Sequence, residues 1–152
     1  MCKRKYIFIS MTILWVGIIF WFSSQPGDVS SDMSATFGRK LLAWLAPGLM
    51  TKLEVISSER LEFWHFLMRK GAHFLEYLVL GILSTLTLSE MRLRHKNIWV
   101  VGFCVMVAAM DETIQLFVPG REGRIMDVYL DSIGAVTGMM VLLCCHMRRK
   151  RV

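Results

Sequence analysis

Acidic, imidazole and amide side chains interrupt three apolar stretches of this 152-residue sequence. Within each stretch, two of them stand three or four residues apart, which places them on one face of an α-helix. An ionisable group in hydrocarbon costs roughly 2.5–3.5 kcal/mol on insertion scales, so such groups face a bundle interior or a wet cavity. The pattern therefore predicts one buried polar site built from three helices. Its expected residues are His73, Glu76, Asp111, Glu112, Gln115, Asp127 and Asp131.

Metal binding is the first chemistry that these residue types allow. Carboxylate oxygens and imidazole nitrogens are ligands of divalent ions, and a bound ion can activate water or polarise a phosphoryl group. Asp111, Asp127 and His73 are expected at the centre of the site and are the candidate metal ligands. The sequence has no P-loop, H-E-x-x-H, nucleophile-elbow or C-x-x-C motif, so no named class of enzyme is predicted.

Two other interpretations involve the turn "PGREGR", residues 119–124. Arg121 and Arg124, at the expected rim of the site, can hold the phosphate of a polar lipid or lipid-linked head group through paired hydrogen bonds. Alternatively, these arginines, His73 and Lys70 neutralise the acids in an internal network that joins the helices. The residue types leave recognition of a ligand, a structural network and a metal enzyme open.

Four apolar stretches must position this site, each near the roughly 17–25 residues that cross a bilayer as a helix. Hydrophobic residues make up 55% of the chain, and the mean hydropathy is +0.48, which is typical of a membrane protein. The sequence predicts an all-α membrane protein, a four-transmembrane-helix bundle in a single domain over residues 1–152. The expected spans are residues 6–22, 71–89, 97–118 and 125–146.

An outer loop, residues 23–70, separates the first two spans. Apolar Met33, Phe37 and Trp44 recur in it at helical spacing. This pattern predicts an amphipathic helix that lies in the membrane interface or packs on the bundle, and Pro47 with Gly48 is expected to end it. A second helix is expected to start near residues 57–58 and to continue into the second span.

The distribution of basic residues predicts the orientation of the chain. They are densest in residues 3–5, 92–96 and 148–151. The positive-inside rule places these segments, and thus both termini, in the cytoplasm, which leaves the polar site in the outer leaflet. Basic ends can also bind anionic lipid head groups. The net charge of +6 therefore has a membrane explanation, and no nucleic-acid partner is expected.

Glycines mark the packed face of the last span. Gly134 and Gly138 form a G-x-x-x-G pair on the same helical stripe as Asp127 and Asp131. Small residues at this spacing let two helices approach closely. The two aspartates are therefore expected to face another helix and not the lipid.

Three motifs carry a family resemblance. They are "FSSQPG" at residues 22–27, "RKGAHFLEYLVLG" at residues 69–81 and "DETIQLFVPGREGRIMDVYLDSIGAVTG" at residues 111–138. In this order they resemble the VanZ-like family of bacterial membrane proteins, which is named for a teicoplanin-resistance protein. The resemblance implies a four-helix protein of the bacterial cytoplasmic membrane. Its motif positions here are His73, Glu76, Asp111, Glu112, Gln115, Arg121, Asp127 and Asp131.

The resemblance also implies an action at the cell envelope that lowers susceptibility to teicoplanin-type lipoglycopeptides. These drugs bind cell-wall precursors outside the membrane, and the acyl chain of teicoplanin anchors it there. The expected partners are therefore membrane lipids, a lipid-linked cell-wall precursor or the lipoglycopeptide itself. The alternative function is that of a divalent-metal-dependent enzyme acting on a lipid phosphate or pyrophosphate.

Overall fold

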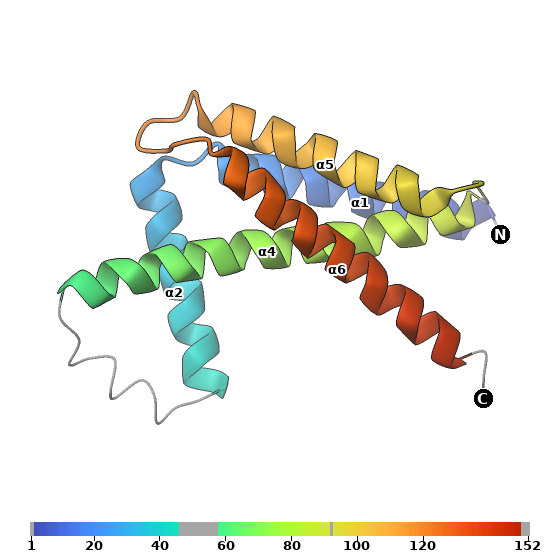
Figure 1. Cartoon of the computed structure of the whole chain (residues 1–152), viewed down its shortest axis with the longest axis horizontal. Helices are drawn as coiled ribbons and strands as arrows, with labels where there is room; N and C mark the ends of the chain where they lie inside the picture. The colour runs from blue at the N-terminus through green and yellow to red at the C-terminus, as the bar shows by residue number, and fades with distance from the viewer. Residues whose placement is uncertain (1, 46–57, 92, 150–152) are drawn as a thin grey trace.

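A computed structural model describes residues 2–45, 58–91 and 93–149 of the chain (Figure 1). Within these ranges all regular structure is helical, so the prediction of an all-α fold is confirmed. The helices are α1 (Cys2–Ser23), α2 (Gly27–Leu45), α4 (Ser58–Glu90), α5 (Lys96–Gln115) and α6 (Ile125–Arg149).

Among the described residues, four helices are long and apolar enough to cross a membrane, as predicted. Their spanning segments are Lys3–Ser23, Phe66–Glu90, Lys96–Gln115 and Ile125–Cys145. The helix expected between the first two spans is α2, and α4 begins at Ser58 and continues without a break through the second span. Pro47 and Gly48, expected to end the amphipathic helix, lie outside the described residues.

The third span is shorter than expected, since α5 ends at Gln115 and not at residue 118. The N–H groups of Phe117 and Val118 donate to the carbonyls of Ile114 and Gln115 at 3.0 and 3.1 Å. These bonds reach back three residues, which tightens the last turn beyond α-helical geometry. Pro119 follows and lacks an N–H to donate, so the chain leaves the helix here.

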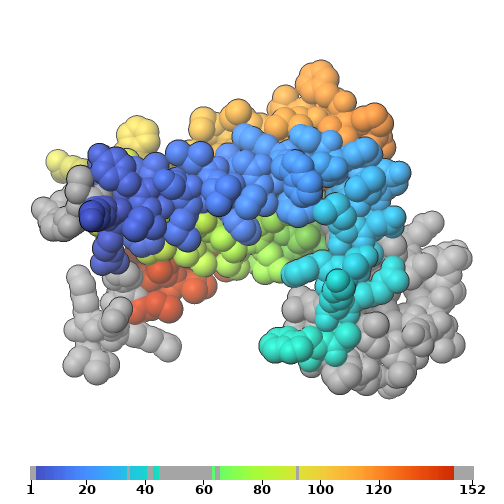
Figure 2. Space-filling model, turned by 180° about the vertical axis from the view of Figure 1, so that it is seen from behind, coloured from blue at the N-terminus to red at the C-terminus, as the bar shows by residue number. Residues whose placement is uncertain are grey.

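The central helix of the bundle is α4, which contacts α1, α2, α5 and α6. In Figure 1, the start of α1, the end of α4, the start of α5 and the end of α6 lie at one end of the bundle. The α1–α2 and α5–α6 turns lie at the opposite end. From behind, in Figure 2, α1 lies in front with α5 along its upper edge and α4 along its lower edge, and α2 leaves the bundle at an angle. The candidate polar residues belong to the end where the two turns meet.

The bundle has a buried apolar core and also exposes large apolar side chains on its outer surface. Apolar side chains of α1, α4, α5 and α6 form one core beneath the polar residues. Large apolar side chains on the outer faces are exposed, for example Leu14 of α1, Ile98 of α5 and Met126 of α6, as lipid-facing side chains would be. The buried core residues are Ile19, Tyr77, Leu80, Val100, Cys104, Val107, Ala108, Ala135 and Met139.

Glycines bring the backbones of α4 and α6 together. A Cβ added to Gly134 would meet the Phe74 carbonyl oxygen at 2.6 Å, and one added to Gly138 would overlap the Leu78 carbonyl. On the other side, a Cβ on Gly81 would overlap the backbone of Ala135. The G-x-x-x-G pair thus faces α4, and the same stripe carries the aspartates of α6 toward the bundle interior.

We expect Gly138→Ala to destabilise the protein by about 1–3 kcal/mol, the usual cost of overpacking, because the obstacle is rigid backbone. The measurement is thermal unfolding of the detergent-purified protein. Gly102→Ala is the matched control, since a Cβ at Gly102 meets nothing within 4 Å and alanine favours a helix by about 0.5–1 kcal/mol. An equal melting temperature for Gly138→Ala and the wild type would contradict the close approach.

Candidate functional site

The site is built where the two turns dock on each other. The N–H of Gly27, at the start of α2, donates to the carbonyl of Pro119 at 3.1 Å. Gly120 has a positive φ of 71°, which glycine adopts without steric cost. A Cβ on Gly27 would overlap the backbone of Gly120. Two glycines therefore let the segments "SSQPG" and "PGREGR" pack backbone to backbone.

Arg121 completes this junction. Its Nη2 donates to the Phe22 carbonyl at 2.9 Å, and its Nε donates to the Gln25 carbonyl at 3.1 Å. The last carbonyls of a helix have no partners within it, and a cation there also complements the helix dipole. The Nη1 of the same guanidinium is buried without a hydrogen-bond partner. Arg121 thus holds the end of α1 and keeps one donor group free.

Two opposing effects act on the pKa of Arg121. Burial lowers the pKa of Arg121, whereas the nearby carboxyl groups of Asp111 and Glu76 raise it. A guanidinium starts from so high a pKa that it stays protonated in proteins. Arg121 is therefore a cation at the polar end of the bundle.

Asp111 lies at the centre of a hydrogen-bonded group. Its side chain is fully buried, its Oδ1 accepts a hydrogen bond from Ser23 Oγ, and its Oδ2 accepts one from Gln115 Nε2 at 3.1 Å. Gln115 Nε2 also lies 3.2 Å from Ser23 Oγ and 3.4 Å from Glu112 Oε1. These contacts join the end of α1 to α5 and fix the orientation of the Asp111 carboxylate.

Three helices each contribute one residue to a second cluster. One ligand atom from each of His73 of α4, Asp111 of α5 and Asp131 of α6 lies within 4.8 Å of the other two. Asp131 is completely buried, and neither of its carboxylate oxygens has a hydrogen-bond partner. We call His73, Asp111 and Asp131 the three-helix cluster.

Asp127 lies apart from this cluster. Its carboxylate forms an ion pair with Lys70 of α4, and the two side chains are only 14% and 15% exposed. Of the metal-ligand candidates Asp111, Asp127 and His73, the structure therefore brings two together, and Asp131 takes the third position. The two aspartates of one helical stripe therefore have different surroundings, since Asp127 pairs with Lys70 and Asp131 points into the three-helix cluster.

The remaining expected site residues lie around the cluster. Glu76 Oε2 is 3.7 Å from His73 Nδ1, and buried Glu112 accepts the backbone N–H of Arg124 at 2.8 Å. The side chain of Arg124 is 54% exposed and bonds to Glu122 at 2.5 Å. That contact lowers the pKa of Glu122 and raises the pKa of Arg124. Arg124 thus acts through its backbone on the site, and its charge faces outward.

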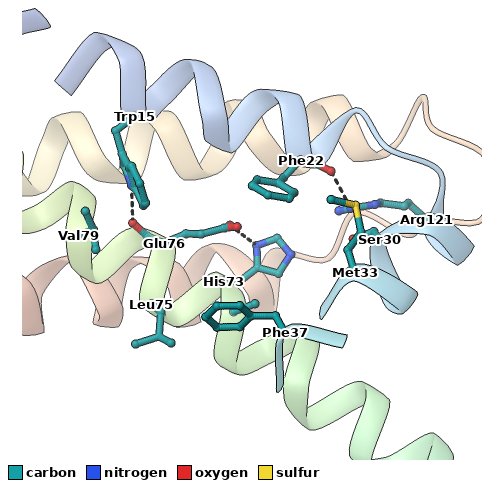
Figure 3. Close-up of a pocket in the computed structure, with 11 residues that line it drawn as sticks. Trp15, Phe22, Ser30, Met33, Phe37, His73, Leu75, Glu76, Val79 and Arg121 are labelled. Carbon is teal, nitrogen blue, oxygen red and sulfur yellow. Dashed lines mark hydrogen bonds and ion pairs between the residues drawn. The ribbon is translucent and has the colours of Figure 1, made fainter. Parts of the chain in front are cut away.

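A cavity of about 420 Å³ opens between α1, α2 and α4, beside the cluster. In Figure 3, the His73 ring lies between Phe22 and Phe37, with Glu76 on one side and Arg121 on the other. Trp15 closes one wall and donates its indole N–H to the Glu76 carbonyl at 2.9 Å. We call this the α1–α2–α4 cavity. It is lined by Trp15, Phe22, Ser30, Met33, Phe37, Ala72, His73, Leu75, Glu76, Val79 and Arg121.

The sequence of the chain matches a known protein family. A family profile described as VanZ/LLP1 matches residues 8–146, which include every site residue described above. The chain belongs to the VanZ/LLP1 family. The family resemblance of the three motifs is thereby confirmed. No curated protein and no solved structure gives a significant match to this VanZ/LLP1 protein.

Two polar groups of the site were not expected from the sequence. Ser23 contacts Asp111 across the docked turns, and the hydroxyl of fully buried Tyr77 has no hydrogen-bond partner. The available signal for Ser23 was its place in the "FSSQPG" motif directly after an apolar span. Tyr77 follows Glu76 in the second motif but reads as an ordinary apolar core residue, and no pattern distinguishes it.

Proposed function

We propose that this VanZ/LLP1 protein binds an anionic lipid or a lipid-linked cell-wall precursor of the bacterial envelope in the α1–α2–α4 cavity. The phosphate of the head group pairs with Arg121, and part of an acyl or prenyl chain lies along the apolar wall. Through this binding, the protein alters the outer surface of the membrane and lowers susceptibility to teicoplanin-type lipoglycopeptides.

One observation carries the proposal. The cavity joins an apolar wall, which includes Phe37, Leu75 and Val79, to a buried cation with an unpaired N–H group at Arg121 Nη1. Its volume of about 420 Å³ falls within the roughly 300–1,000 Å³ of small-molecule sites, so it suits a head group and the upper part of one chain. A charged donor that is buried without a partner favours an anionic group in the ligand.

The charge distribution supports an outer-leaflet location for this binding. The end of the bundle opposite the site carries Lys3, Lys5, Lys96 and Arg149. Under the positive-inside rule, this end faces the cytoplasm and both termini are inside. The cavity then opens near the outer surface, where lipid-linked precursors are displayed and where a lipoglycopeptide inserts its acyl chain. We therefore place the protein in the bacterial cytoplasmic membrane.

The test blocks the cavity without touching Arg121. Ala72 lines the cavity, and we expect Ala72→Trp to lower the affinity for phosphatidylglycerol and undecaprenyl phosphate about tenfold or more. The wild type should prefer both over uncharged diacylglycerol by a similar factor, because one charge-assisted hydrogen bond contributes about 1.5–3 kcal/mol. Native mass spectrometry of the detergent-purified protein measures both comparisons.

The matched control is Ala109→Trp, which places the same side chain at an exposed position on α5. This variant should bind the lipids as the wild type does and should raise the minimum inhibitory concentration of teicoplanin equally in a susceptible host. Ala72→Trp should lose that protection, and a glycopeptide without an acyl chain should show little protection with any variant. Equal lipid binding by both tryptophan variants would refute the proposed cavity.

A further inference from the structure

We infer that the three-helix cluster, His73, Asp111 and Asp131, binds one divalent transition-metal ion of the Mn²⁺ or Zn²⁺ type. The three ligand atoms lie within 4.8 Å of one another and come from α4, α5 and α6. Metal–ligand bonds of about 2.1 Å in tetrahedral geometry require ligand atoms roughly 3.4 Å apart. Rotations of these side chains that move their ends by about 1 Å around a bound ion bring the atoms to that separation.

The strongest observation is the state of Asp131. Its side chain has no exposed surface, and both oxygens lack any hydrogen-bond donor. A buried polar group without a partner costs several kcal/mol, and an unpaired carboxylate costs more. His73 Nδ1 is likewise buried without a hydrogen-bond partner. Tyr77 and Arg121 also have buried polar atoms without a partner, but Asp131 is the only one of these side chains in which both oxygens of a carboxyl group lack one. A cation bound at the cluster satisfies the Asp131 carboxylate.

The charges around the cluster lead to the same inference. Among the described residues, no Lys or Arg nitrogen lies within 4.0 Å of the Asp111 or Asp131 carboxylate. Lys70 of α4 is paired with Asp127. Arg121 is near Asp111 but makes no ion pair with it, so the two buried carboxylates have no direct cationic partner. An ion of charge +2 bound between them neutralises both at once.

Asp111 already has the surroundings of a metal ligand. Ser23 and Gln115 each donate a hydrogen bond to one of its two oxygens. Such outer partners fix the orientation of a coordinating carboxylate and leave lone pairs free for the metal. Asp131 has no such partner, so the ion itself would hold its side chain in place.

The donor set indicates the type of ion. Imidazole nitrogen with carboxylate oxygen suits Mn²⁺, Zn²⁺ and related ions, whereas Ca²⁺ takes six to eight oxygen ligands. Three protein ligands leave coordination positions for water or for a ligand group. Because His73 also lines the α1–α2–α4 cavity, the open position is near the place proposed for an anionic head group. The ion site itself does not depend on that proposal.

The experiment measures metal uptake in the absence of added lipid. The full chain carries Cys144→Ser and Cys145→Ser, because these two exposed thiols would otherwise bind Zn²⁺. After chelator treatment in detergent, Mn²⁺, Zn²⁺ or Ca²⁺ is titrated while bound metal and melting temperature are recorded. We expect one Mn²⁺ or Zn²⁺ per chain and a rise in melting temperature of roughly 5–10 °C at 100 times the dissociation constant. Ca²⁺ should have little effect.

Asp131→Asn is the decisive variant and Asp127→Asn its matched control. Both remove one carboxylate from α6, but only Asp131 belongs to the cluster. We expect Asp131→Asn to weaken metal binding at least tenfold, and Asp127→Asn to keep one metal per chain and the same rise in melting temperature from a lower starting value. If Asp131→Asn does not fold, His73→Gln replaces it with the same expectation.

Three outcomes would overturn the inference. The wild type takes up no metal, Asp131→Asn binds metal as tightly as Asp127→Asn does, or Asp127→Asn alone loses binding. The lipid-binding test is independent, because Ala72→Trp should retain metal while losing lipid. Failure of one proposal is therefore distinguishable from failure of the other.

Discussion

Lys70→Met is expected to lower the free energy of unfolding by about 3–5 kcal/mol, because it leaves the Asp127 carboxylate buried without its cation. The ion pair between Lys70 and Asp127 is mostly shielded from water, with both side chains no more than 15% exposed. Lys70 Nζ also lies 5.4 Å from the centre of the Phe66 ring, which adds a smaller cation–π contribution. Unfolding of the detergent-purified protein by heat and by denaturant measures the change.

The double variant Lys70→Met with Asp127→Leu should recover most of that loss. Removing both charges leaves no uncompensated ion, and apolar replacements of buried ion pairs are often neutral or stabilising. Lys40→Met on α2 is the control, since Lys40 is exposed and should change stability little. If the single Lys70 variant were as stable as the wild type, the pair would be solvated like a surface salt bridge.

The fold could be predicted from the sequence because it depends mainly on the lengths of the apolar stretches and on the spacing of apolar residues. Four apolar stretches of spanning length predicted the bundle, and the amphipathic pattern around Met33 and Phe37 predicted α2. That pattern did not determine what α2 contacts. In the structure, Met33 and Phe37 line the cavity while remaining partly exposed, so the apolar face of α2 closes the site on one side.

The arrangement within the site was harder to predict because helical spacing gives a stripe and not a partner. Asp127 and Asp131 are one turn apart on the same stripe, yet one pairs with Lys70 and the other points into the three-helix cluster. Which aspartate meets which group depends on where α6 crosses α4, and this is set by backbone contacts at Gly134 and Gly138. No local pattern in the sequence contains that crossing point.

The contact of Ser23 could not be predicted from local sequence patterns either. It contacts Asp111 although 88 residues separate them in the chain. The contact exists because Gly27 and Gly120 let the two turns dock, and Arg121 then fastens the end of α1. Docking of two irregular segments has no periodicity from which it could be predicted, whereas each turn could be recognised from its Gly and Pro residues.

The two arginines of the turn provide the second large expected effect. Arg121→Leu should destabilise the protein by about 3–5 kcal/mol, because it removes two charge-assisted hydrogen bonds of roughly 1.5–3 kcal/mol each. The carbonyl of Gln25 would lose its arginine donor, and that of Phe22 would keep only the backbone N–H of Gln25 at 3.2 Å. Arg124→Leu is the matched variant, since its side chain is exposed and pairs with exposed Glu122, a contact that salt screens.

We expect the melting temperature of Arg124→Leu to equal that of the wild type, and that of Arg121→Leu to fall by roughly 6–20 °C for a chain of this size. Arg121→Lys should recover only part of the difference, because an ammonium group keeps the charge but cannot span two carbonyls as the planar guanidinium does. Equal losses for Arg121→Leu and Arg124→Leu would mean that the turn needs positive charge in general. A selective loss at Arg121 would mean that one guanidinium joins the α1–α2 turn to the α5–α6 turn and thereby holds the polar site together.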